Sequence, residues 1–221
     1  MKMDGDLKVF DARLHHPSAM LVCGPSQSGK STFTYNLLCK LSYLYDHEIS
    51  YIVWFHGNPT PLHEVLKETF GPKIQIVQNL PESFDEYICK NENGMFIFDD
   101  LMVETSNSKI MTNMFCRQSH HENISIILLT QNLFSEGRER RNFLRNCHYL
   151  VLFKNPLDLS IPYTIAQKVM PKRTKLFINI FEKATNKPNG YLFIDGHQNS
   201  NPAAKFRTNL FDDTQHTFLI E

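Results

Sequence analysis

The chain has 221 residues, 42% of them hydrophobic, and its 23 basic and 23 acidic side chains leave a formal net charge of zero. A chain of this length buries a large core without disulfides or metal, so we expect residues 1–221 to form a single domain. The balanced charge excludes a polybasic protein that binds nucleic acid through bulk charge, but it is compatible with a nucleic-acid motor that has a local basic surface.

Short β-rich segments alternate with amphipathic segments, which is typical of an α/β fold with a mostly parallel sheet. We expect strands at residues 18–23, 49–55, 74–77, 95–98, 124–129, 148–153 and 191–194. We expect helices at residues 30–44, 62–70, 81–90, 106–120, 136–146, 158–170 and 172–185. Residues 206–211 should form an edge strand or be loosely ordered. The wholly apolar runs are short, whereas a membrane span needs about 20 such residues, so we expect no membrane partner.

The first chemical motif follows the strand at 18–23. Residues 24–32 read GPSQSGKST and fit the phosphate-loop (Walker A) pattern, with a strand before it and an amphipathic helix after it. Lys30 can place its ammonium between the β- and γ-phosphates, and the Ser31 hydroxyl can ligate Mg²⁺. We therefore predict an ATP and Mg²⁺ site. The predicted nucleotide-binding residues are Gly24, Pro25, Ser26, Gln27, Ser28, Gly29, Lys30, Ser31 and Thr32.

Two adjacent carboxylates, Asp99 and Asp100, follow the apolar run at 95–98 in a Walker B pattern. A buried strand explains the apolar run but not two acids at its end. We predict that Asp99 holds the Mg²⁺ shell and that Asp100 orients and deprotonates the attacking water. The alternative is a pair of solvated acids that cap the following segment.

A third feature, Gln131, ends the strand expected at residues 124–129. Many NTPases that activate water insert an extra strand between the phosphate-loop strand and the acidic strand, and we place that strand here. The Gln131 amide can then hydrogen-bond the water or the γ-phosphate, although an ordinary strand-terminating glutamine is the alternative. The predicted fold is an α/β P-loop NTPase of the additional-strand (RecA/FtsK-like) type, with a central, mostly parallel sheet flanked by helices.

Four motifs in order carry a family resemblance: GPSQSGKST, MFIFDDL, SIILLTQN and LRNCHYLVLFKNP. Together they resemble the poxvirus-type genome-packaging ATPases of the FtsK/HerA superfamily, with relatives in virophages and in Polinton-like and related DNA viruses. The resemblance covers roughly residues 17–156 and leaves residues 157–221 without a matched motif. Gln131 matches the glutamine that is the signature of the superfamily. Asp100 departs from it, because many relatives carry glutamate there.

The resemblance implies a homo-oligomeric ring, pentameric or hexameric, that hydrolyses ATP and pumps double-stranded DNA into a preformed capsid at a capsid or portal vertex. It also implies a location in the host nucleus, in a cytoplasmic virus factory or in the virion. Such motors need an arginine from the neighbouring subunit. We favour Arg145, which precedes the strand at 148–153, over Arg138, Arg140, Arg141 and Arg117. A solvated basic helix face is the alternative.

Two other functions stay open. One is a helicase or another DNA translocase of the same superfamily. The other is a non-hydrolysing, nucleotide-gated scaffold, which the departure at Asp100 favours. The basic clusters at 138–141 and 172–175 are candidate contacts to the DNA phosphate backbone. Contacts of this kind bind DNA of any sequence.

Overall fold

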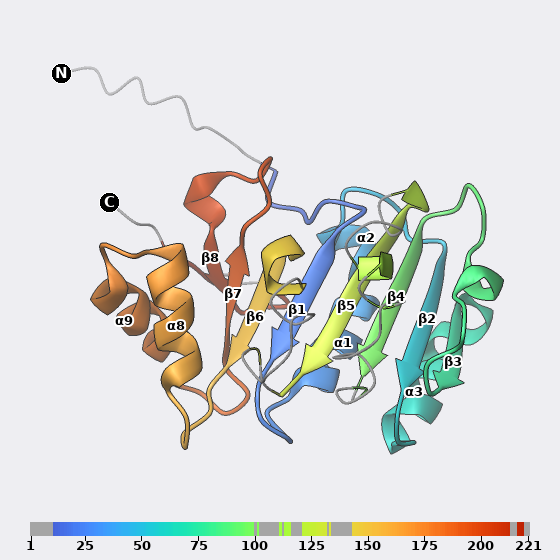
Figure 1. The fold of residues 1–221 in the computed structure, drawn as a ribbon, viewed down its shortest axis with the longest axis horizontal. Helices are drawn as coiled ribbons and strands as arrows, with labels where there is room; N and C mark the ends of the chain where they lie inside the picture. Colours follow the sequence, from blue (N-terminus) through green and yellow to red (C-terminus); the bar gives the residue numbers. More distant parts are fainter. Residues whose placement is uncertain are drawn as a thin grey trace.

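The described strands of the computed structural model form one nine-stranded sheet, with the order β3-β2-β4-β5-β1-β6-β7-β8-β9 (Figure 1). The structure describes residues 11–99, 101, 111, 113–115, 121–131, 133, 143–212 and 216–218. The strands are β1 (Ala19–Cys23), β2 (Tyr51–His56), β3 (Ile74–Gln78), β4 (Gly94–Asp99), β5 (Ile124–Thr130), β6 (Tyr149–Phe153), β7 (Tyr191–Asp195), β8 (Phe206–Thr208) and β9 (His216–Thr217). Strands β1 to β6 pair in parallel, and β7 to β9 add an antiparallel extension. The mostly parallel α/β fold predicted from the sequence is confirmed.

The strand order also settles where the extra strand lies. β5 pairs with β4 on one side and with β1 on the other, so it separates the strand that ends at Asp99 from the strand that enters the phosphate loop. This is the arrangement predicted for residues 124–129. The carboxyl ends of β2, β4, β5 and β1 consequently meet along one edge of the sheet.

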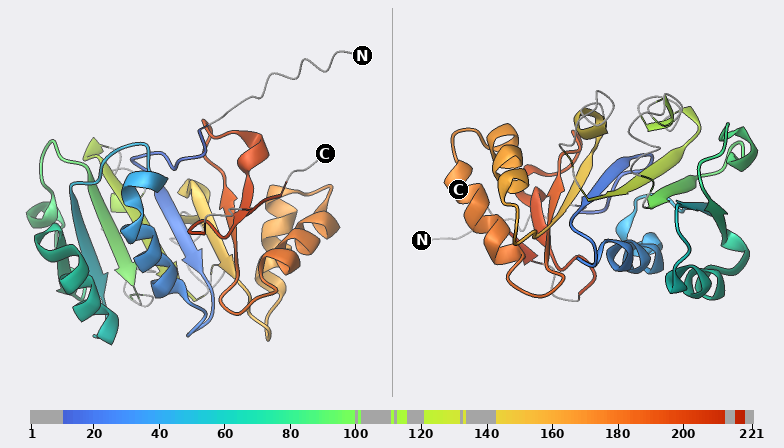
Figure 2. Two further views of the ribbon diagram at one scale, coloured as in Figure 1. Left: turned by 180° about the vertical axis from the view of Figure 1, so that it is seen from behind. Right: turned by 60° about the horizontal axis from the view of Figure 1, so that its bottom comes forward.

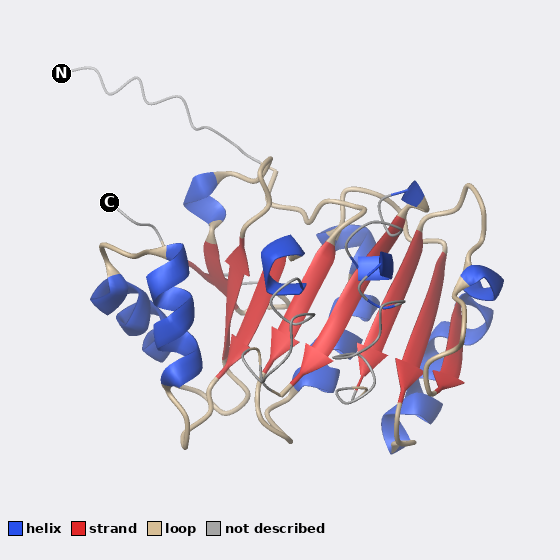
Figure 3. Cartoon of the chain, viewed as in Figure 1, coloured by secondary structure: helices blue, strands red, loops and turns tan. Residues whose placement is uncertain are grey.

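Helices cover both faces of the sheet (Figures 2 and 3). They are α1 (Lys30–Cys39), α2 (Leu41–Leu44), α3 (Pro61–Phe70), α8 (Ser160–Val169) and α9 (Thr174–Ala184), with short 3-10 turns at η1 (Gly71–Lys73), η2 (Asp85–Tyr87) and η4 (Pro202–Ala204). Strand side chains alternate between faces. Met20 and Val22 therefore belong to the buried cluster that contains Phe33 of α1, whereas Leu21 belongs to the cluster of the opposite face, which contains Phe177 of α9. No helix in the described part of the chain has the length and apolarity of a membrane span.

The expected helix at 81–90 is wrong, since only the single turn η2 forms there. The Phe84 side chain is 2% exposed and packs edge-on against the stacked rings of Phe55 and Phe98, with ring-centroid distances of 5.4 and 5.7 Å. The Ser83 hydroxyl exchanges local hydrogen bonds with Asp85, which compete with helical ones. Core packing of one aromatic ring, together with local polar bonds, thus overrides helix propensity.

Two other expected elements differ from the structure, and two expected helices lie largely outside the described residues. The helix expected at 30–44 is interrupted at Lys40, which separates α1 from α2. Residues 206–208 form β8, which is not an edge strand because β9 pairs with its outer side. Most of the helices expected at 106–120 and 136–146 lies outside the described residues, and only 143–146 of the second is described as helical.

A buried ion pair joins the antiparallel strands. Arg207 on β8 donates from Nη2 to Asp195 Oδ2 on β7 at 2.9 Å, and both side chains are 3% exposed. The guanidinium also donates to the Ala12 carbonyl at 2.7 Å and lies 4.7 Å from the centre of the Phe193 ring. This pair ties the C-terminal strands to the chain that leads into β1.

Candidate nucleotide site

The loop between β1 and α1 is shaped by its two glycines. Gly29 precedes α1 with φ of 99°, in the left-handed region that favours glycine. Gly24 meets a different constraint, since a Cβ there would lie 2.6 Å from both Phe153 Cβ and Ser28 Oγ. The backbone between them turns back so that α1 starts at the carboxyl edge of the sheet, where a helix N-terminus attracts a phosphate.

Lys30 and Ser31 start α1 and face this loop and β4. Lys30 Nζ donates to the carbonyls of Gly24 and Pro25, at 2.8 and 2.9 Å. Ser31 Oγ donates to Asp99 Oδ2 at 3.1 Å. The serine and the aspartate that the sequence assigned to Mg²⁺ are therefore in direct contact, although they lie far apart in the chain.

A cavity of about 170 Å³ lies above these groups. Ser26, Gln27, Lys30 and Ser31 line it from the loop and α1, Asp99 from β4, and Thr130 and Gln131 from the end of β5. Gln131, Lys30 and Asp99, three of the predicted site residues, line this one cavity. Asp100 lies outside the described residues.

The donor set fits Mg²⁺. This ion prefers oxygen ligands, and it is held by one or two carboxylates together with substrate phosphates and water. Ser31 and Asp99 present a hydroxyl and a carboxylate to the same cavity. Within the described residues, no group of three or more histidine, cysteine, aspartate or glutamate side chains could hold a metal. The remaining ligands would therefore come from the nucleotide and from water.

His56, which the sequence analysis did not single out, also lines this cavity. The residue ends β2 and lies directly opposite Asp99 in the pairing of β2 with β4. Its side chain is 6% exposed, and burial lowers the pKa of the imidazole. The available signal was positional: His56 ends a β-rich run just before a turn, as Asp99 does in its own strand.

The His63 ring packs against His56 at a tilt of 36°, and its side chain caps the N-terminus of α3. The two ring centroids are 4.0 Å apart, and the Thr60 backbone N–H donates to His63 Nδ1 at 3.2 Å in a capping box. Burial, the largest influence, lowers the pKa of His63 to about 4. At neutral pH its ring is uncharged and carries its proton on Nε2.

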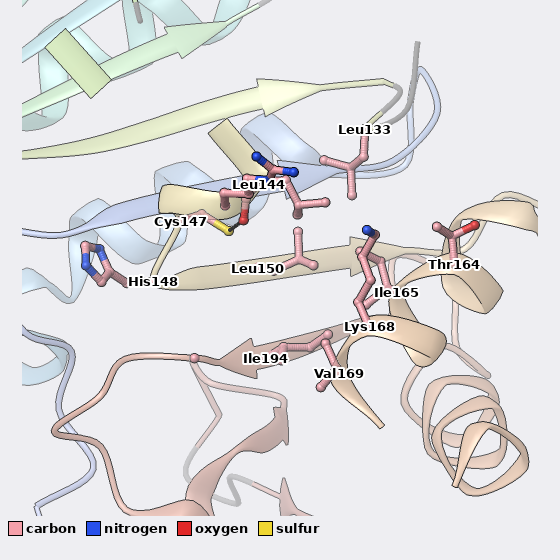
Figure 4. A pocket seen from close by; sticks show the side chains of 12 residues that line it. Leu133, Leu144, Cys147, His148, Leu150, Thr164, Ile165, Lys168, Val169 and Ile194 are labelled. Atoms are coloured by element: carbon pink, nitrogen blue, oxygen red, sulfur yellow. Dashed lines mark hydrogen bonds between the residues drawn. The ribbon is translucent and has the colours of Figure 1, made fainter. Parts of the chain in front are cut away.

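Arg145 lies away from the nucleotide cavity. It is exposed and precedes β6, which runs parallel to β1, so the amino end of β6 lies at the edge of the sheet opposite the phosphate loop. It lines a second, mostly apolar cavity of about 390 Å³ between β6, β7 and α8 (Figure 4). No residue is common to the linings of the two cavities. Arg145 therefore lies outside the nucleotide cavity of its own chain.

No protein-family model matches this chain, and no curated protein sequence is similar to it. Solved structures are similar. The genome packaging NTPase B204 of Sulfolobus turreted icosahedral virus 2, in complex with sulfate, superposes with a TM-score of 0.56 at 14% identity, covering 81% of this chain and 92% of B204. This chain has the B204 fold.

Two further B204 structures agree. The complex with ATP-gammaS gives a TM-score of 0.54 at 15% identity and covers 81% of this chain and 92% of B204. B204 from Sulfolobus turreted icosahedral virus, described as a DNA-packaging ATPase, gives 0.53 at 16% identity and covers 81% and 93%. At these identities the likeness establishes the fold, and the chemistry of this chain must be argued from its own side chains.

Proposed function

We propose that this chain is an ATPase that drives double-stranded DNA into a preformed viral capsid. The observation that carries the proposal is one cavity in which Lys30, Ser31, Asp99 and Gln131 meet at the start of α1. The B204 fold supports it, because the solved B204 structures include one with ATP-gammaS and one described as a DNA-packaging ATPase. The packaging role further rests on the resemblance of the four sequence motifs.

The loop residues 24–32 would bind the triphosphate of ATP. Lys30 would exchange its contacts with the Gly24 and Pro25 carbonyls for contacts with the β- and γ-phosphates. Mg²⁺ held near Ser31 and Asp99 would neutralise charge that develops on the phosphates. The start of α1 supplies backbone N–H groups for the same purpose.

Hydrolysis would proceed by attack of water on the γ-phosphorus. The water oxygen bonds to phosphorus, the bond from phosphorus to the β–γ bridging oxygen breaks, and ADP and phosphate leave. Asp100 would take the proton of the water, and Gln131, in the cavity wall, would orient the water or the γ-phosphate. The two carboxylates of the strand end thereby have separate roles.

The transition state also needs a cation at the γ-phosphoryl group. We propose that Arg145 of a neighbouring subunit provides it, within a homo-oligomeric pentamer or hexamer. Its absence from the lining of the nucleotide cavity of its own chain supports a role in trans. The ring would act at a capsid or portal vertex, in the host nucleus or a cytoplasmic virus factory.

The test combines ATP hydrolysis, with and without double-stranded DNA, with particle mass from light scattering. We expect DNA to stimulate hydrolysis by a ring-sized particle, with a steep decrease in stimulation as salt rises and little dependence on DNA sequence. Lys30→Ala is the matched inactive control, because it removes the only lysine of the loop. Tight ATP binding without turnover would point to a nucleotide-gated scaffold instead. Strand separation on a forked substrate would point to a helicase.

A further inference from the structure

His56 is a buried polar side chain whose environment in the fold is incomplete. Its Nδ1 has no hydrogen bond of good geometry among the described residues, although the Asn58 backbone interacts with the ring and partly opposes the lowering of its pKa by burial, and the side chain is 6% exposed. Buried polar atoms of proteins nearly always have a partner. The ring lines the nucleotide cavity, so a molecule bound in that cavity is the available partner.

The neighbours of His56 show which part of the cavity it lines, namely the part next to Asp99. His56 and Asp99 are register partners on β2 and β4, strands that lie about 4.8 Å apart, so their side chains project side by side on one face of the sheet. That face is the one covered by α1, because Trp54 and Ile97, two positions earlier on each strand, pack in the cluster that contains Phe33. Asp99 in turn accepts a hydrogen bond from Ser31.

The adjacent ring of His63 is not placed to contact a ligand in the cavity. The His63 ring packs against His56 at a tilt of 36° and accepts the backbone N–H of Thr60 on Nδ1. Its Nε2 is also buried without a hydrogen-bond partner among the described residues, but His63 does not line the cavity. His56 therefore has a supporting ring behind it and a carboxylate beside it. A nitrogen held in this way suits a fixed hydrogen bond to a water of a metal shell.

We propose that His56 is a positioning residue for the metal of the nucleotide site, and that its Nδ1 accepts a hydrogen bond from a Mg²⁺-bound water while Asp99 holds the ion. The proposal rests on the proposed nucleotide site and extends it to a residue outside the recognised motifs. Residues that hydrogen-bond to the ligands of a metal orient those ligands, and loss of such a residue lowers metal affinity by about 10- to 100-fold.

Two substitutions separate the hydrogen bond from the packing. His56→Phe keeps a ring on His63 and removes the nitrogen, whereas His56→Asn loses the ring but can place an amide atom near the position of Nδ1. His63→Phe is the matched control, because it changes the neighbouring ring, which does not line the cavity. Thermal unfolding of each variant checks that the fold is retained.

The experiment measures the dissociation constant of a fluorescent ATP analogue across a Mg²⁺ titration and in EDTA. For His56→Phe we expect about 10- to 100-fold more Mg²⁺ at the midpoint, with unchanged binding in EDTA. His56→Asn should recover part of the shift, and His63→Phe should show none. An unshifted midpoint in His56→Phe, or an equal loss of binding in EDTA, overturns the role of His56. If the wild-type chain binds no nucleotide with Mg²⁺, the proposed nucleotide site itself fails.

Discussion

Replacing Arg145 with alanine should abolish ATP hydrolysis and leave ATP binding intact. β1 and β6 pair in parallel, with Met20 opposite Tyr149 and Cys23 opposite Leu152. At about 3.3 Å per residue, the five residues of β6 span about 13 Å, and Arg145 precedes even the first of them. The phosphate loop follows Cys23 at the far end of this distance. Arg145 does not line the nucleotide cavity of its own chain, so the catalytic effect that we propose for it would come from a second subunit.

The size of the effect follows from phosphoryl transfers in which an arginine acts in trans, where it contributes about 10³–10⁵ in rate. Arg145 is exposed, so its truncation should change stability by no more than about 0.5 kcal/mol. Lys90→Ala, which removes another exposed cation, is the control for a general effect of lost charge.

The assay is phosphate release by each variant alone and by an equal mixture of Arg145→Ala with Lys30→Ala. In the mixture, some interfaces pair an intact loop with an intact arginine, and no homogeneous ring of either variant contains such an interface. Partial return of activity is therefore expected. If mixed rings form, as measured by mass-tagged subunits, and activity stays absent, Arg145 does not act across the subunit interface. Arg117, Arg138, Arg140 and Arg141 would then be tested in the same way.

Three other outcomes are expected. Asp99→Asn should remove Mg²⁺-dependent hydrolysis; a variant that keeps the wild-type Mg²⁺ dependence would contradict its metal role. Asp195→Ala leaves the Arg207 cation buried without its carboxylate, so urea unfolding should report a loss of about 3–5 kcal/mol, and a loss below about 1 kcal/mol would contradict the pair. The pKa of His63 is about 4 in the folded chain and about 6.5 when unfolded, so only the unfolded chain gains this proton as pH falls from about 6.5 towards 4. Stability should fall over that interval, and the melting temperature of His63→Phe should fall less steeply there; equal slopes would argue against this assignment.

Much of the site could be predicted from the sequence because its signals are local. The loop at 24–32 combines glycines, a lysine and a hydroxyl at fixed spacing, and its flanking strand and helix have clear periodicity. Apolar runs that end in a polar residue placed Asp99 and Gln131 at strand ends. Parallel strands share one carboxyl edge, so these residues had to meet near the loop once the strand order was known.

The tertiary structure alone decided what depends on contacts between distant segments. The turn at 85–87 replaces a helix because Phe84 packs into an aromatic cluster built by other strands. His56 becomes part of the cavity only through its register with Asp99, which no local pattern encodes. Arg145 was a candidate by motif, but its separation from the phosphate loop follows from the parallel pairing of β1 with β6. Local propensity acts over a few residues, whereas register and burial are set by the whole sheet, and this is why the sequence determined the motifs and the sheet determined their neighbours.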